Sequence, residues 1–184
     1  MHKMEQNEVL EYFDFLQSLA DAAAKITLSY FRQKVHVENK NSQTNKIDPV
    51  TIADQKAEEV IRELILKKYP KHTIIGEEFD TIDGNPNYRW FIDPIDGTKS
   101  FISGVPLWGT LIGLEVNNVP ELGIIDIPCM NERYLGSHAL KKAIRIKDGV
   151  SEDVTTSSEN ELKNLKFGYT TDEMFDDKRS RKVL

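Results

Sequence analysis

The sequence predicts an α+β fold in which N-terminal helices pack on one face of a mainly antiparallel sheet. Two segments, 5–33 and 51–68, carry apolar residues at every third or fourth position, which is the period of an amphipathic helix. Farther along the chain, segments 107–116 and 121–127 are rich in β-branched residues and flank an Asn-Asn-Val-Pro turn at 117–120, as in an antiparallel hairpin. Helices followed by a run of strands are typical of layered α+β domains.

The second predicted helix begins with a recognisable cap. Thr51 is followed three residues later by Asp54, which matches the capping-box pattern, and Pro70 lies just beyond the expected end at Lys68. An acidic side chain in the first turn also complements the helix dipole. Capping is therefore a sufficient structural explanation for Asp54, and a catalytic role for Asp54 is the alternative.

The remaining segments define the expected domain organisation. Segment 39–48 is polar and aperiodic, so we expect a mobile loop there, with a lid as one role. Segment 142–147 alternates in polarity and predicts an edge strand. From 148 to 166 the chain is polar, like a connector, and 167–171 could begin another strand. We therefore expect an N-terminal metal- and phosphate-binding domain at 1–147 and, at 148–184, a connector with the start of a second domain.

An apolar run that breaks into two carboxylates is the candidate centre of the chemistry. Residues 89–92 have the content of a buried strand, and Pro94 is expected to stop it. Asp93 and Asp96 then lie at the strand end, where a turn lets both carboxylates converge. Gly97 follows as a plausible helix start whose backbone N–H groups can face an anion.

A second acidic element lies upstream. Residues 72–76 read as another short strand, and this strand ends in Glu77 and Glu78. Two strands that end in acids could bring Glu77 beside Asp93 and Asp96, and such a group suggests a hard cation that holds a phosphate. The alternative is that Asp-Pro and Asp-Gly are ordinary turn dipeptides with no function.

Composition limits the classes of partner. The chain has 39% hydrophobic and 29% charged residues and a formal charge of −6, so it is globular and a poor match for nucleic acid. A small anion would need a local positive centre such as a metal. Cys129 is the single cysteine and has no intrachain partner. No secretory segment follows the start, and no apolar stretch approaches the ~20 residues that span a bilayer. We expect a cytoplasmic protein without a membrane partner.

Three elements in this order resemble the inositol monophosphatase superfamily: Asp54 in Thr-Ile-Ala-Asp-Gln, the run Ile-Ile-Gly-Glu-Glu at 74–78, and Trp-Phe-Ile-Asp-Pro-Ile-Asp-Gly-Thr at 90–98. The residues that follow look closest to its histidinol-phosphatase branch. The resemblance implies the layered α/β sandwich of that family and a Mg²⁺-dependent phosphomonoesterase that acts on a small phosphorylated substrate. Histidinol phosphate is the expected substrate, and inositol phosphate is the alternative. The likeness to the branch rests on segments 99–104, 106–112 and 123–128.

The resemblance also implies a metal-ligand set. Glu77, Asp93 and the backbone carbonyl of Ile95 would hold one Mg²⁺. Asp93 and Asp96 would share a second one. This assignment agrees with the preference of Mg²⁺ for oxygen ligands, and two metals about 3.5–4 Å apart can stabilise both the attacking and the leaving oxygen of a displacement.

Catalytic and substrate-binding roles follow from the same resemblance. Glu77 and Thr98 would orient the attacking water, and Asp54 would be a further catalytic residue. The backbone of Gly97 and Thr98 would receive the phosphate. The full set of implied substrate-binding residues is Glu77, Ile95, Asp96, Gly97 and Thr98.

The resemblance extends from the first helix to Phe175 and stops before two C-terminal elements of the family. These are a Trp-Asp or Pro-Tyr-Asp element, whose aspartate completes the second metal site, and a Gly-Gly-Asp-Cys segment that shapes the substrate pocket. An incomplete second domain is therefore implied, and two functions stay open: an active phosphatase, or a truncated, catalytically inactive fragment or binding subunit. An unpaired sheet edge near 167–171 would favour self-association, with a homodimer as one form.

Overall fold

The computed structural model describes residues 4, 6–33, 37–39 and 49–166. The chain divides into two compact units, Met1–Val154 and Thr155–Leu184. The described part of the second unit contains the short 3₁₀ turn η2 (Leu162–Asn164). The strand expected at 167–171 and nearly all of the loop expected at 39–48 lie outside the described residues, apart from Asn39, which ends a strand.

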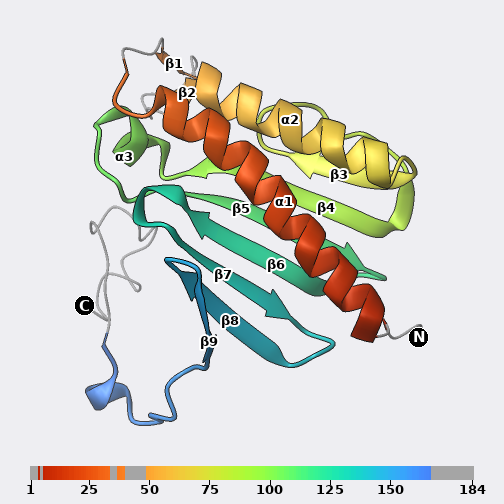
Figure 1. Ribbon diagram of the computed structural model, residues 1–184, viewed down its shortest axis with the longest axis vertical. Helices are drawn as coiled ribbons and strands as arrows, with labels where there is room; N and C mark the ends of the chain where they lie inside the picture. Colours follow the sequence, from red (N-terminus) through yellow and green to blue (C-terminus); the bar gives the residue numbers. More distant parts are fainter. Residues whose placement is uncertain (1–3, 5, 34–36, 40–48, 167–184) are drawn as a thin grey trace, which may run out of the picture. The chain divides into compact units, whose positions relative to one another are not determined.

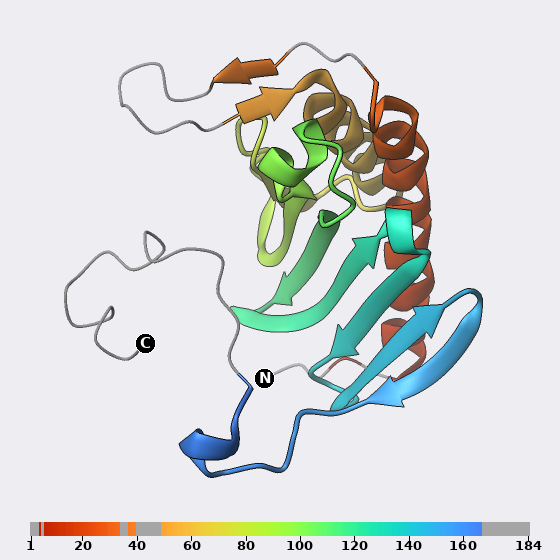
Figure 2. The ribbon, with the colours of Figure 1, turned by 90° about the vertical axis from the view of Figure 1, so that its left-hand side faces the viewer.

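Two helices cover one face of the main sheet in the first unit. They are α1 (Gln6–Tyr30) and α2 (Ile52–Lys68), and both lie on the same side of the strands (Figures 1 and 2). Their bounds agree with the predicted segments to within three residues. None of the helices in the described part of the chain combines the length and the apolar character that a bilayer crossing requires.

The main sheet has seven strands among the described residues, in the order β3-β4-β5-β6-β7-β8-β9. The pair β3–β4 is parallel and the five following pairs are antiparallel, so the mainly antiparallel sheet is confirmed. A separate antiparallel pair joins β1 (Val37–Asn39) to β2 (Pro49–Thr51). The bounds of the main strands are β3 His72–Gly76, β4 Asn85–Asp96, β5 Gly109–Val116, β6 Val119–Ile127, β7 Glu132–Ser137, β8 Lys142–Lys147 and β9 Val150–Val154.

The far edge of the sheet differs from the prediction. β8 is not an edge strand, because β9 pairs with it across 150–154, inside the segment expected to be a connector. β9 is exposed over nearly its whole length, so it lacks the alternation that reveals a strand. Charge pairs accompany the pairing instead: Lys142 Nζ lies 2.9 Å from Asp153, and Arg145 Nη2 lies 2.7 Å from Glu152.

The strand β4 is also longer than predicted. It begins at Asn85 and continues through Pro94 to Asp96, whereas the sequence predicts a stop at Pro94. The pairing of β4 with β5 shifts between Asp93 and Asp96. A proline is tolerated at such an irregularity, because the ladder donor that proline lacks is not required there.

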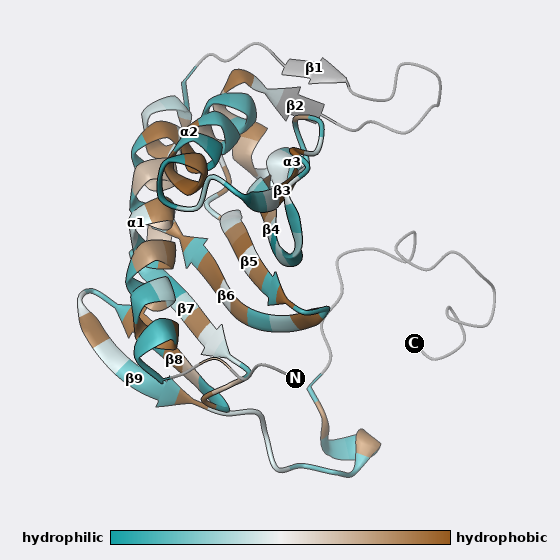
Figure 3. Cartoon of the chain, turned by 90° about the vertical axis from the view of Figure 1, so that its right-hand side faces the viewer, coloured by the Kyte–Doolittle hydropathy of each residue, from teal (hydrophilic) through white to brown (hydrophobic). Residues whose placement is uncertain are grey.

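Alternation along the strands divides the sheet into two faces. Trp90 and Ile92 of β4 are buried under the helices, with Ile112 of β5 and Ile124 of β6. The colour bands along the strands in Figure 3 show this alternation. A smaller apolar cluster of Ala53, Ile95, Phe101 and Trp108 holds α3 (Thr98–Ile102) against the end of β4. Ile92 belongs to the first cluster and Ile95 to the second, so the two clusters flank the part of β4 that carries Asp93.

Candidate active site

Asp54 completes the capping box of α2, in which Thr51 is the N-cap, as the sequence predicts. Its Oδ2 accepts hydrogen bonds from the Thr51 backbone N–H (2.9 Å) and the Thr51 hydroxyl (2.6 Å). The Thr51 hydroxyl oxygen in turn accepts the N–H of Ala53 (3.1 Å), and both halves of the capping box are present. Asp54 is only 2% exposed. The cap fixes a buried carboxylate at the end of α2 that lies nearest the other candidate acids.

The register shift in β4 places two carboxylates on one face of the sheet. Asp93 is paired with Leu111 of β5, and Asp96 is paired with Gly109. Leu111 and Gly109 are two residues apart and share a face, and directly opposed residues of an antiparallel pair point the same way. Asp93 and Asp96 therefore share that face, although an unbroken strand would place residues three apart on opposite faces.

Two hydroxyl groups hold the irregular segment of β4. Thr110 donates to the carbonyl of Pro94 (2.8 Å), and Thr98 donates to the carbonyl of Ile95 (3.1 Å). The structure thus brings together Thr98 and the Ile95 carbonyl, two of the predicted site groups. Between them, Gly97 has φ +89°, a left-handed conformation that glycine adopts without strain, and it precedes the short helix α3. Asp96 and Gly97 are exposed, and Thr98 is half-buried.

Glu77 reaches Asp93 from the neighbouring strand. β3 runs parallel to β4 with Gly76 opposite Ile92, so the residue after each lies at the same edge. A side-chain hydrogen bond joins Glu77 to Asp93. Desolvation raises the pKa of Asp93 from 3.8 to about 7, and the charge of Glu77, the hydrogen bond with Glu77, and the charges of Asp96 and Asp54 contribute to the same rise. The four predicted acids are thus within electrostatic range of one another.

Two of these acids border a hollow on the sheet face opposite the helices. Its volume is about 500 Å³, and Glu77 and Asp93 line it with the exposed apolar side chains Phe91 and Ile125. Another hollow, of about 410 Å³, lies between α1 and strands β6 to β8 and contains none of the predicted site residues. A convergent polar group in a largely apolar hollow is the usual form of a small-molecule site.

The donor groups at this site have the chemistry that a hard cation requires. Asp93 Oδ1 is buried and accepts no hydrogen bond from any residue that the structure describes. Carboxylate oxygens and the Ile95 carbonyl are the ligand types that Mg²⁺ prefers. Nevertheless, no three His, Cys, Asp or Glu side chains within 4, 6–33, 37–39 and 49–166 form a group that could hold a metal ion. The residues fit a cation by chemistry, and the ligand assignment stays a prediction.

The sequence analysis missed two charged residues that support the site. Glu58 is fully buried on α2 and Arg62 is 7% exposed, although charged residues of an amphipathic helix are expected on its solvent side. The spacing of the charged residues could have revealed their burial. Asp54, Glu58 and Arg62 recur every four residues and therefore share one side of the helix. That side also carries the buried residues Ala57 and Ile61. Glu58 accepts the backbone N–H groups of the turn that follows Glu77.

Known structures share this layered fold. An inositol monophosphatase from Anabaena superposes with a TM-score of 0.61 at 28% identity, over 76% of this chain and 51% of that one. Inositol monophosphatase II from Staphylococcus aureus superposes with a TM-score of 0.63 at 23% identity, over 83% of this chain and 53% of that one, and supports the fold alone. These likenesses establish an α+β sandwich of the inositol monophosphatase type.

The sequence carries the assignment further, since the profile of the inositol monophosphatase family matches residues 8–182. The chain belongs to the inositol monophosphatase family. It is 42% identical over 150 residues to a histidinol-phosphatase from Chlorobaculum parvum, covering 81% of this chain and 55% of that protein. It is 40% identical over 156 residues to the chloroplastic bifunctional phosphatase IMPL2 of Arabidopsis thaliana, covering 84% and 42%. The chain spans about half the length of these relatives.

Proposed function

We propose that this chain carries the metal- and phosphate-binding half of a Mg²⁺-dependent phosphomonoesterase. The observation that carries the proposal is the buried Oδ1 of Asp93, which accepts no hydrogen bond among the described residues and lies beside Glu77 in an apolar hollow. A buried carboxylate oxygen of this kind is costly unless it has a ligand. The inositol monophosphatase family is generally metal-dependent, which supports a cation as that ligand.

In this proposal Glu77, Asp93 and the Ile95 carbonyl hold one Mg²⁺, and Asp93 and Asp96 share a second. A bound Mg²⁺ supplies Lewis acidity and a water of lowered pKa. Glu77 is exposed at the end of β3. Its carboxylate would accept a hydrogen bond from the attacking water and so orient that water toward the phosphate. Thr98 contributes its hydroxyl, which the Ile95 carbonyl holds at 3.1 Å.

The chain's own backbone supplies the phosphate contact in this proposal. The phosphate lies against Gly97 and Thr98, and the hollow beside Asp93 receives the rest of the substrate. Asp54 keeps the end of α2 in place through its cap, and its buried charge adds to the negative potential that a cation would neutralise. Its catalytic role is thus supported less directly than its capping role.

Histidinol phosphate is the proposed substrate. The resemblance of segments 99–104, 106–112 and 123–128 to histidinol-phosphatases and the 42% identity to the Chlorobaculum parvum protein of that name support it. An inositol phosphate is the second candidate, since a plant protein named inositol monophosphatase is 33% identical over 158 residues. A third candidate function is a binding fragment without turnover, because this chain spans only about half the length of these relatives.

A parallel binding and turnover experiment tests the proposal. Titration calorimetry with Mg²⁺ should give a heat of binding for the wild-type chain, which Asp93→Asn should abolish. Asp83→Asn, an exposed aspartate in the turn before β4, is the matched control and should bind normally. Phosphate release from histidinol phosphate, compared with inositol 1-phosphate, then separates the candidates. Absence of Mg²⁺ binding by the wild type contradicts the metal site, and binding without release favours the binding fragment.

A further inference from the structure

A buried ion pair on α2 lies directly behind the turn that carries Glu77. Arg62 Nε donates to Glu58 Oε1 at 2.7 Å, and the two side chains are 8% and 0% exposed. Glu58 is i−4 to Arg62, so both project from one side of the helix toward β3. Charges removed from water this completely require hydrogen bonds to nearly every oxygen and N–H they carry.

The backbone of residues 78–80 supplies those hydrogen bonds. Glu58 Oε2 accepts the N–H of Glu78 at 2.8 Å, and Glu58 Oε1 accepts the N–H of Phe79 at 3.3 Å. Arg62 donates in the opposite direction, from Nη2 to the Phe79 carbonyl (2.9 Å) and from Nη1 to the Asp80 carbonyl (2.9 Å). Four hydrogen bonds therefore fix three successive residues immediately after Glu77.

Gly76, the residue before Glu77, also lies against the Glu58 carboxylate. A Cβ atom on Gly76 would lie 1.9 Å from Glu58 Oε1 and 2.3 Å from its carboxyl carbon. Because these atoms belong to a side chain that is fully buried and held on its far side by Arg62, they have little room to retreat. Only glycine at this position lets the Glu58 carboxylate lie against the backbone on which Glu77 is mounted.

We infer that Glu58 and Arg62 form a positioning pair that aims Glu77 at Asp93, and this inference rests on the proposed function. Glu77 is bounded by Gly76, which touches the pair, and by Glu78, whose N–H the pair holds. The backbone on both sides of Glu77 is therefore fixed, and it determines the direction in which the Glu77 side chain projects. Side chains behind a metal ligand commonly change metal affinity 10–100-fold when they are replaced.

The same helix carries this pair and Asp54, so it connects two segments of the candidate site. Asp54 lies one turn before Glu58 on α2, is buried, and acts on Asp93 through its charge. α2 therefore sets both the Asp54 carboxylate and the turn of Glu77. A role limited to fold stability would lower the melting temperature and leave metal affinity unchanged, whereas a positioning role changes affinity in molecules that are still folded.

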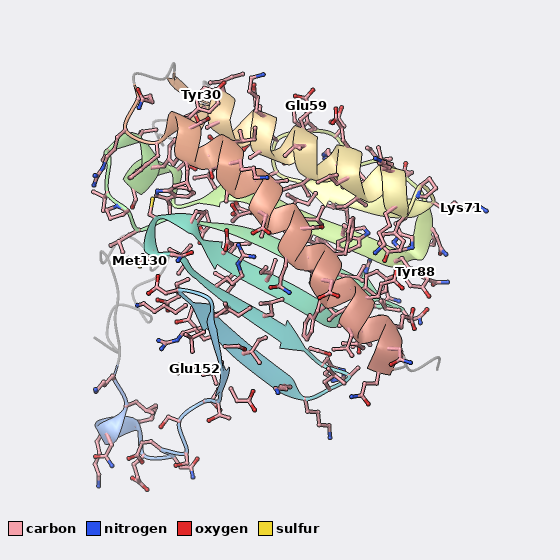
Figure 4. All side chains as sticks on the ribbon, in the orientation of Figure 1. Tyr30, Glu59, Lys71, Tyr88, Met130 and Glu152 are labelled. Carbon is pink, nitrogen blue, oxygen red and sulfur yellow. The ribbon has the colours of Figure 1, made fainter. Side chains whose placement is uncertain are left out.

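The test measures Mg²⁺ affinity by titration calorimetry on chains shown to be folded by circular dichroism. Glu58→Gln keeps the side-chain length but removes the charge and one acceptor, so the dissociation constant should rise at least about 10-fold. Glu59→Gln is the matched control, because Glu59 is exposed on the outer side of α2 (Figure 4), and it should leave affinity unchanged. Gly76→Ala reaches the same carboxylate from the turn and should weaken binding similarly.

Should Glu58→Gln fail to fold, Arg62→Lys replaces it, since lysine keeps the charge but loses the two-pronged contact with the Phe79 and Asp80 carbonyls. A folded Glu58→Gln or Arg62→Lys chain with wild-type affinity overturns the positioning role and leaves the proposed function intact. A wild-type chain that binds no Mg²⁺ overturns the proposed function and the positioning role together. Weaker binding in the folded variants, with Glu59→Gln unchanged, supports both.

Discussion

Replacing Asp93 by asparagine should stabilise the chain at pH 7.5 when no divalent cation is present. Burial and the neighbouring charges of Glu77 and Asp96 raise the pKa of Asp93 from 3.8 to about 7, so its ionised form is disfavoured in the folded state. The folded state holds the proton up to about pH 7, while the unfolded chain releases it near pH 3.8. The free energy of unfolding should therefore fall as the pH rises between those values.

The size of this effect follows from the pKa difference. At 1.36 kcal/mol per unit of pKa, a rise from 3.8 to about 7 sets an upper limit of about 4 kcal/mol. Asp93 is only half-buried and water screens part of the interaction, so we expect about 2 kcal/mol. Asparagine keeps the shape of the side chain without the charge, and Asp93→Asn should recover this energy at pH 7.5 and much less of it at pH 4.5.

Urea denaturation in EDTA at pH 4.5 and pH 7.5 measures both values. A second series with Mg²⁺ should reverse the order at pH 7.5, because a cation at 100 times its dissociation constant stabilises the wild type by about 2.7 kcal/mol and the variant hardly at all. The reasoning is refuted if Asp93→Asn is less stable than the wild type in EDTA at pH 7.5, or if Mg²⁺ stabilises the two chains equally.

Three further measurements test the fold and the cap. Thr51→Ala and Asp54→Asn should each cost about 1 kcal/mol in urea denaturation while keeping most of the Mg²⁺ response, and a complete loss of that response in Asp54→Asn would favour a catalytic role over the cap. Burial lowers the pKa of His72, whose Nδ1 accepts the Trp90 indole N–H at 3.1 Å, so protonation of His72 should oppose folding as the pH falls below about 6.5 and offset part of the gain expected from Asp93; a His72→Phe chain should therefore gain more stability, measured as melting temperature, on acidification than the wild type, and an equal pH slope would contradict this. Leu16→Ala, at a fully buried position of α1, should cost about 3 kcal/mol by urea denaturation, and a cost below 1 kcal/mol would show that the helix packs differently.

The sequence predicted most of the layers because periodicity reports directly on burial. Both helices, the capping box of Thr51 and Asp54, and the hairpin of residues 107–127 are confirmed, although its turn holds only Asn117 and Asn118 because β6 already begins at Val119. The two asparagines have φ values of 53° and 63°, which is the left-handed geometry that a two-residue hairpin turn requires. These features depend on local chemistry, so a single sequence contains them.

Features set by pairing or by buried polar contacts were not predictable in the same way. β9 has no buried face, and pairing with β8 makes it a strand. Pro94 breaks an ordinary strand, but the hydroxyl of Thr110, sixteen residues away, bonds its carbonyl and the strand continues. The burial of Glu58 depends on partners that are backbone groups of another segment, which the helical pattern does not reveal. Each of these cases depends on residues that are distant along the chain.

The irregular pairing within β4 also governs how this region can change in length. Two residues of β4, Pro94 and Ile95, lie opposite the single residue Thr110 between the pairs that hold Asp93 and Asp96. Losing one of the two would restore strict alternation, with Asp93 and Asp96 two residues apart and still on one face of the sheet. It would instead remove a carbonyl that a threonine hydroxyl holds, either that of Pro94, which Thr110 bonds, or that of Ile95, which Thr98 bonds. A one-residue deletion there should therefore keep the two carboxylates together while it disrupts the turn that leads into α3.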